Sequence, residues 1–144
     1  MEFPCGVFME NKKDNWIYFG VFLDEESKNK LYKTMEPKIP EDWKIFCHHM
    51  TIAFNNKTES AENLYNKYKP FFGEKINITA THFGRTMEAM AVNVDFDGET
   101  LNKYPHVTVA TSEIGKPVES NFITVWKTLE SPIQLTGILN AFYK

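Results

Sequence analysis

Short segments rich in aromatic and β-branched residues recur along the whole chain and limit what this sequence can fold into. Such segments are typical of β-strands that have at least one buried face. Two stretches, 24–36 and 60–71, have the apolar spacing of helices with a proline near the end, and a short third helix is expected over 119–126. The sequence therefore predicts a fold of mixed helices and strands. The expected strands span 16–23, 43–54, 76–81, 87–96, 104–111 and 133–142, with turns at Gly84-Arg85 and Asp97-Gly98.

The two halves of the sequence also resemble each other. In the first half, WIYFGVFL is followed by an acidic turn, a helix and HHMTIAF. In the second half, MEAMAVNVDF is followed by an acidic turn and PHVTVAT. The helix between the two strands is largely missing from the second copy. This pattern favours a duplicated strand–connection–strand unit.

Length and composition favour one domain over residues 1–144. Hydrophobic residues make up 42% of the chain and include 12 Phe, 6 Tyr and 3 Trp, which supplies a core and excludes a disordered chain. The formal net charge is −3, and gripping a long nucleic-acid backbone normally needs a basic face. DNA is therefore not an expected partner.

No segment of the sequence predicts secretion or membrane insertion. The longest apolar run, 17–23, is far shorter than a membrane span, and the first four residues lack the positive start of a signal peptide. Cys5 and Cys47 are too few for a disulfide framework. We therefore expect two reduced thiols in a cytoplasmic protein that has no membrane partner.

Two of the expected strands repeat one pattern, HMTI beginning at His49 and HVTV beginning at His106. Side chains alternate between the two faces of a strand, so each His shares a face with the Thr two residues later. The interleaved apolar residues occupy the opposite face, which can join a core. The pattern therefore predicts that His49, Thr51, His106 and Thr108 face a groove.

The residue types in these two motifs suit phosphodiester chemistry. Histidine changes charge near neutral pH, so two histidines that face one substrate can act as general acid and general base. Two threonine hydroxyls and one imidazolium can stabilise an anion whose charge grows in the transition state. This reaction needs no metal or other cofactor, and four histidines with two distant cysteines offer too few ligands for a metal site.

On these motifs the sequence resembles the 2H phosphoesterase superfamily, which is named for paired His-x-Thr/Ser motifs. The likeness extends over nearly the whole chain and includes KPVESN after the second motif. The resemblance implies an α+β fold with two lobes related by a pseudo-twofold axis, in which antiparallel sheets form a central cleft and the helices lie outside. It also implies that His49 and His106 are the acid–base pair and that Thr51 and Thr108 bind the phosphate.

Three further side chains are candidates for contact with a substrate. Tyr104 has the parity of His106, so regular alternation places it on the same face, where it could stack on a base. Arg85, placed after Gly84, could bind a phosphate or a base edge with two hydrogen bonds, and a solvated turn residue is the alternative. Tyr18 in the first strand is the third candidate.

Two neighbours of the first motif have less specific interpretations. Alternation places His48 on the opposite face from His49, which favours a packing or hydrogen-bonding role. Cys47 has the parity of His49, but a buried small hydrophobic residue is the simpler interpretation.

The resemblance also implies metal-independent cleavage or ring-opening of nucleotide phosphodiesters that involve a 2′-oxygen. With the two motifs, it leads us to expect a metal-independent phosphodiesterase that cleaves a 2′-linked phosphodiester of a small nucleotide. Candidate substrates are a cyclic dinucleotide, such as 2′,3′-cGAMP, and a 2′–5′ oligoadenylate. One alternative is a 2′,3′-cyclic phosphodiesterase that processes RNA 3′ ends, and the other is a non-catalytic nucleotide-binding module. The small nucleotide is the expected partner, and the protein is expected to be a monomer.

Overall fold

The fold is described from a computed structural model, in which residues 15–144 are placed well enough to describe. Cys5 and the first residues of the chain lie outside this range. The helices are α2 (Glu25–Met35) and α3 (Glu59–Tyr68), and the 3₁₀ turns are η1 (Glu36–Lys38), η2 (Lys69–Phe71) and η3 (Pro117–Phe122). The strands are β1 (Trp16–Leu23), β2 (Lys44–Ile45), β3 (His49–Phe54), β4 (Lys75–Arg85), β5 (Ala89–Asp95), β6 (His106–Thr111) and β7 (Lys127–Tyr143).

Side-chain caps begin both helices, and a turn that contains proline follows each of them. The Asp24 side chain accepts a hydrogen bond from the Ser27 amide at 2.8 Å, and the Thr58 side chain accepts one from the Ala61 amide at 3.2 Å. These caps satisfy amides that have no partner inside a helix. Each helix then passes into a 3₁₀ turn that contains proline, because proline cannot donate to a further helical turn.

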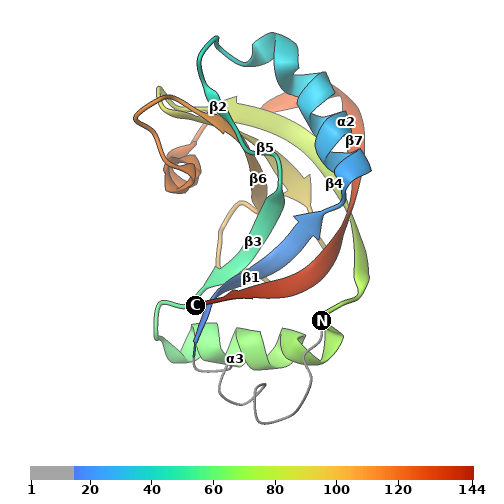
Figure 1. The fold of residues 1–144 in the computed structure, drawn as a ribbon, viewed down its shortest axis with the longest axis vertical. Helices are drawn as coiled ribbons and strands as arrows, with labels where there is room; N and C mark the ends of the chain where they lie inside the picture. Colours follow the sequence, from blue (N-terminus) through green and yellow to red (C-terminus); the bar gives the residue numbers. More distant parts are fainter. Residues whose placement is uncertain (1–14) are drawn as a thin grey trace.

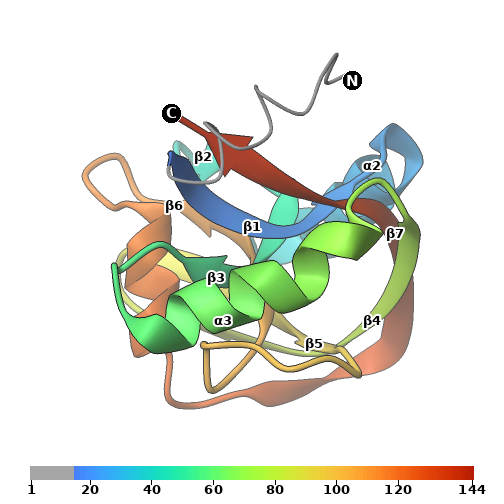
Figure 2. The same ribbon diagram turned by 90° about the horizontal axis from the view of Figure 1, so that it is seen from below.

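The strands close into a six-stranded antiparallel barrel. Their order is β6-β3-β1-β7-β4-β5, and β5 pairs again with β6 to complete the ring, while β2 pairs with β6 beside β3. Figure 1 shows α2 toward one end of this ring and α3 across the other, and Figure 2 looks onto α3 from below. Buried side chains from α2 and α3, including Leu31, Met35, Leu64 and Tyr65, join the barrel core.

The expected two-lobed fold with a central cleft is wrong, although the protein does mix helices with antiparallel strands. The long strand β7 pairs through 137–143 with β1 and through 127–138 with β4, so it joins the two halves of the chain in one sheet. The pairing of β5 with β6 closes that sheet. Residues 15–144 therefore form one closed ring of strands in place of two duplicated lobes.

The two faces of the barrel strands divide as alternation requires. Met50 and Ile52 of β3, and Val107 and Val109 of β6, are completely buried in the core. Their neighbours in the two His-x-Thr motifs are only partly buried and lie on the outer face. The candidate site is consequently carried by the outside of the barrel.

The expected strand over 43–54 is interrupted by a bulge that separates β2 from β3. Ile45 pairs with Ala110, and Met50 pairs with Val107. The five residue steps from Ile45 to Met50 therefore lie opposite only three residue steps in β6. Cys47, within this segment, has a φ of 57°, a left-handed conformation that a regular strand does not contain. This bulge removes the alternation of side chains between residues 45 and 50.

Other boundaries also differ from the sequence-based expectations. Gly84-Arg85 does not form a turn, because both residues pair with β5 at the end of β4. The expected helix over 119–126 is the shorter 3₁₀ turn η3, and β7 begins six residues before the expected start at 133. Within residues 15–144, no helix is both long enough and apolar enough to cross a membrane.

Gly20 allows β1 to approach β3 beside the first motif. It pairs with Thr51, next to a bulge in β1, and a Cβ at this position would collide with the main-chain carbonyl of Met50. We predict that Gly20→Ala lowers the free energy of unfolding by about 1–3 kcal/mol, as overpacking typically does. Urea unfolding followed by tryptophan fluorescence measures the change.

Ser131→Ala is the matched control for Gly20→Ala, because Ser131 is exposed on β7. Its free energy of unfolding should stay close to that of the unmodified protein. Equal stabilities for the two variants would show that β1 and β3 do not approach as closely as described.

Candidate active site

Both His-x-Thr motifs line one cavity on the outer face of the barrel. The pairing of Met50 with Val107 runs β3 and β6 antiparallel, which sets Thr51 beside His106 and His49 toward Thr108. The turn η3 supplies the wall opposite the strands. The cavity is lined by Phe46, His48, His49, Thr51, Phe54, Asn102, His106, Thr108, Pro117, Val118 and Asn121.

His106 is oriented by the main chain that precedes it. Its Nδ1 lies 2.8 Å from the carbonyl oxygen of Tyr104, and a carbonyl can only accept, so Nδ1 carries the proton. The neutral ring therefore has its free lone pair on Nε2. Burial lowers the pKa of His106, and the bond to Tyr104 partly opposes that shift. This ring is suited to accept a proton from a substrate.

His49 lies in a more crowded environment, between aromatic rings and other histidines. Its ring stacks on Tyr18, with centroids 4.9 Å apart, and on Phe22 at 5.5 Å. The pKa of His49 is lowered to about 4. Burial is the largest cause, and the nearby charges of His48 and His106 lower the pKa further. The ring is therefore neutral near pH 7 in the absence of a bound anion.

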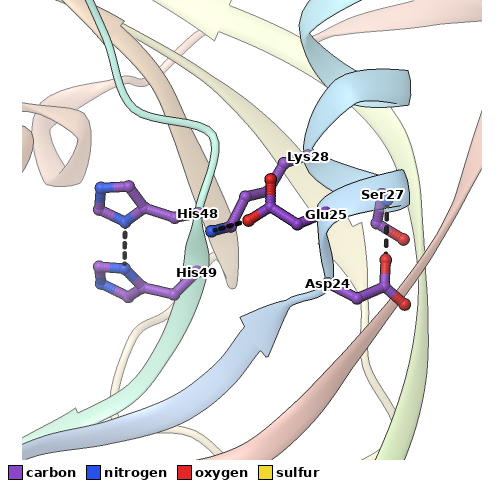
Figure 3. Close-up of polar contacts among 6 residues, drawn as sticks. All are labelled: Asp24, Glu25, Ser27, Lys28, His48 and His49. Atoms are coloured by element: carbon purple, nitrogen blue, oxygen red, sulfur yellow. Dashed lines mark hydrogen bonds and ion pairs between the residues drawn. The ribbon is translucent and has the colours of Figure 1, made fainter.

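The prediction that His48 points away from His49 is wrong. The two Nδ1 atoms lie 2.9 Å apart, and the rings stack with centroids 5.1 Å apart. Figure 3 shows the two rings side by side on the same side of the strand. The bulge at Cys47 causes this, because it interrupts the alternation on which the prediction depended.

Residues from η3 and the loop before β6 support the threonines, and the motif pattern did not identify them. The hydroxyls of Thr108 and Ser120 share a hydrogen bond of 2.9 Å, and Ser120 is buried. The side-chain amide of Asn102 donates to the Thr51 carbonyl oxygen at 3.4 Å. The segment KPVESN, noted in the sequence for its resemblance, supplies Ser120 and the cavity residue Asn121. Spacing alone could not predict the contact of Ser120 with Thr108.

The other three candidate residues, Tyr104, Tyr18 and Arg85, lie at different positions relative to the cavity. Tyr104 precedes β6 and lines a second, adjoining cavity together with Trp126, and that cavity shares Asn102, His106 and Asn121 with the first. Tyr18 packs against His49 without lining the first cavity. Arg85 lies over the ring of Trp43, 4.9 Å from its centroid, and lines neither cavity. The fold therefore brings Tyr104 and Tyr18 to the histidines and leaves Arg85 elsewhere.

Cys47 does not line the cavity, although its parity matches that of His49. The side chain is buried, and burial raises the pKa of its thiol to about 12, so the simpler interpretation as a small buried hydrophobic residue is confirmed. Across residues 15–144, no group of three or more His, Cys, Asp or Glu side chains is arranged to hold a metal ion.

Comparison with known proteins identifies the fold. No protein-family model matches the sequence, and the comparison with curated protein sequences found no match. The structure is similar to the crystal structure of a fungal RNA kinase, with a TM-score of 0.67 and 12% sequence identity. The similarity covers 90% of this chain and 46% of the kinase chain, so this chain spans about half of that structure. At this identity the likeness establishes the fold alone.

The neutral state of His49 in the fold should make stability depend on pH. Its pKa falls from 6.5 in an unfolded chain to about 4 in the fold, so between these values the unfolded protein binds more protons. The free energy of unfolding should therefore fall as the pH is lowered through this range. We predict that His49→Gln, which cannot titrate, makes this decline shallower, as measured by urea unfolding at pH 7 and pH 4.5.

The matched control is His82→Gln, because His82 bonds to the neighbouring Thr81 hydroxyl and lines neither cavity. A His49 variant that kept the full pH dependence of the unmodified protein would contradict the lowered pKa.

Proposed function

We propose that this protein is a metal-independent phosphodiesterase that cleaves a 2′-linked phosphodiester of a small nucleotide. The observation that carries the proposal is the meeting of both His-x-Thr motifs, from residues far apart in the sequence, in one cavity. Two imidazoles and two hydroxyls that line one cavity are the groups that acid–base cleavage of a phosphodiester needs. The resemblance of the motifs to the 2H phosphoesterase superfamily supports the same reaction.

In the first step, His106 is the base. Its Nδ1 proton is held by the Tyr104 carbonyl, which leaves Nε2 free to take the proton of the 3′-hydroxyl. The 3′-oxygen attacks phosphorus, the bond from phosphorus to the 5′-oxygen breaks, and His49 gives that oxygen a proton. The products are a 2′,3′-cyclic phosphate and a free 5′-hydroxyl.

In the second step the two histidines exchange roles. His49 takes a proton from water, the hydroxide oxygen attacks phosphorus, and the ring opens as His106 returns its proton to the departing ribose oxygen. Thr51 and Thr108 hold the non-bridging oxygens in both steps. In this arrangement Ser120 donates to the Thr108 oxygen through their hydrogen bond, which leaves the Thr108 proton for the phosphate and orients that donor before the charge develops.

A second candidate substrate is an RNA 3′ end that carries a 2′,3′-cyclic phosphate. It would require only the second step. The specific observation in its favour is the similarity of this fold to about half of the structure of a fungal RNA kinase.

We predict that the protein cleaves 2′–5′ dinucleotides faster than 3′–5′ dinucleotides, and that EDTA leaves the rate unchanged. His49→Ala and His106→Ala should each lower the rate by about 10²–10⁴-fold, the usual contribution of a general acid or base. A panel of 2′–5′ and 3′–5′ dinucleotides, cyclic dinucleotides, 2′,3′-cyclic mononucleotides and cyclic-phosphate RNA ends, analysed by chromatography, measures the rates.

The panel also separates the alternatives. Cleavage of cyclic-phosphate RNA ends alone would favour the second candidate, and binding without turnover would favour a non-catalytic nucleotide-binding module. Arg85→Gln is the control, because Arg85 lines neither cavity. Full activity in both histidine variants would contradict the proposed mechanism.

The lowered pKa values of the histidines predict an acidic optimum for kcat/KM. One ring must be neutral and the other must be able to give a proton, and burial lowers the pKa of His48, His49 and His106 below 6.5 in the free protein. The maximum of the bell-shaped profile should therefore lie below pH 6.5. A bound phosphate raises the pKa of a nearby imidazole, so the maximum of kcat should lie at a higher pH.

Steady-state kinetics between pH 4 and pH 9 tests this order of the two maxima. A maximum of kcat/KM above pH 7 would show that the histidines are not buried as described.

A further inference from the structure

His48 and His49 form a pair of rings that are in direct contact at the edge of the site. Their Nδ1 atoms lie 2.9 Å apart, which is hydrogen-bond distance, and the planes are inclined by only 16°. Figure 3 shows the bond running between the two rings. Adjacent residues of a regular strand point to opposite faces, so this contact exists only because of the bulge at Cys47.

A hydrogen bond between two Nδ1 atoms requires one proton on that line, carried by one of the two rings. His49 therefore differs from His106, whose Nδ1 donates to a carbonyl oxygen that cannot return a proton. With Nδ1 of His49 engaged by His48, Nε2 is the His49 nitrogen available to a substrate. When His48 is the donor, the Nε2 of His49 carries a proton and is ready to give it.

A positive charge costs less on His48 than on His49. Burial lowers the pKa of both rings, but the His48 side chain is the more exposed of the two, whereas His49 is half-buried and faces His48, His106, Tyr18 and Phe22. Charge is expensive in a buried group because the group loses its hydration. The groups near His48 are His49, the ring of Phe46 and the ammonium of Lys28 from α2. The Lys28 charge also lowers the pKa of His48, and the Glu25 carboxylate, paired with Lys28 at 3.1 Å, offsets part of that charge.

We propose that His48 is the proton reservoir of His49, a positioning residue that carries the positive charge of the pair and passes it on through Nδ1. The proposal rests on the proposed function. As the bond to the leaving oxygen breaks, His49 gives that oxygen its Nε2 proton and takes the Nδ1 proton of His48. The pair begins with one positive charge and ends neutral, and one proton has moved to the leaving oxygen.

The second step reverses this transfer. His49 takes a proton from water at Nε2 and returns its Nδ1 proton to His48, so the pair regains its positive charge. His49 thus changes between acid and base without rotating its ring and without holding the charge in its half-buried position.

The experiment compares His48→Asn and His48→Gln on two substrates with different leaving groups. One is a 2′–5′ dinucleotide, and the other is adenosine 2′-(4-nitrophenyl phosphate), whose nitrophenolate departs without a proton. We expect kcat on the dinucleotide to fall about 100-fold, the lower end of a general-acid contribution, with little change in KM. On the nitrophenyl ester, kcat should change less than about threefold, because no proton is needed on the leaving group.

His106→Ala is the control, because loss of the base should slow both substrates. An equal loss on both substrates in the His48 variants, or no loss on either, would overturn the role of His48. In both cases the unmodified protein would still cleave the dinucleotide, so the proposed function would stand.

A spectroscopic measurement tests the pairing of the two rings independently of activity. ¹⁵N NMR of histidine-labelled protein should show scalar coupling between the Nδ1 atoms of His48 and His49, absent from His48→Gln. If the unmodified protein cleaves neither substrate, the proposed function fails together with the proton transfer. Absence of the coupling in the unmodified protein would overturn the pairing itself, whatever its activity.

Discussion

The pairing of β3 with β6 is the interaction on which the rest of the site depends. It brings residue 50 opposite residue 107, so two motifs more than fifty residues apart become neighbours on one sheet. The same pairing is one of the contacts that complete the barrel. The core holds it in register, because Met50, Ile52, Val107 and Val109 are completely buried, and a slip of one residue would turn them outward.

One wall of the cavity is formed by the regular strands β3 and β6, and another is formed by the turn η3. The strands supply the histidines and threonines from an outer face whose opposite side is packed core, which fixes their directions. The turn η3 then brings Ser120 against Thr108 and places Val118 and Asn121 across the cavity. Burial on this partly covered face lowers the pKa of the histidines in the free protein, so an arriving phosphate anion would favour the charged form of the site.

The closed barrel could not be predicted from the sequence, although most of its strands could. Most strands are predicted by their apolar patterns, although β2 and β3 are predicted as one strand, and the similarity of the two halves suggests two lobes. Closure depends on long-range pairings, namely β7 with both β1 and β4, and β5 with β6. No local pattern encodes which edges meet, since every strand offers the same main-chain groups to a neighbour.

The sequence by itself determined the repeated His-x-Thr pattern and the buried strand faces beside it, because alternation is a local property of an extended chain. It also identified Cys47 as a buried residue. Only the tertiary structure decided that the motifs lie on the outside of one barrel, that Ser120 supports Thr108 and that Arg85 lies elsewhere. It also decided the contact of His48 with His49, because that contact needs the left-handed backbone at Cys47. The pairing of β2 and β3 with β6 accommodates this conformation, and the residue types alone do not predict it.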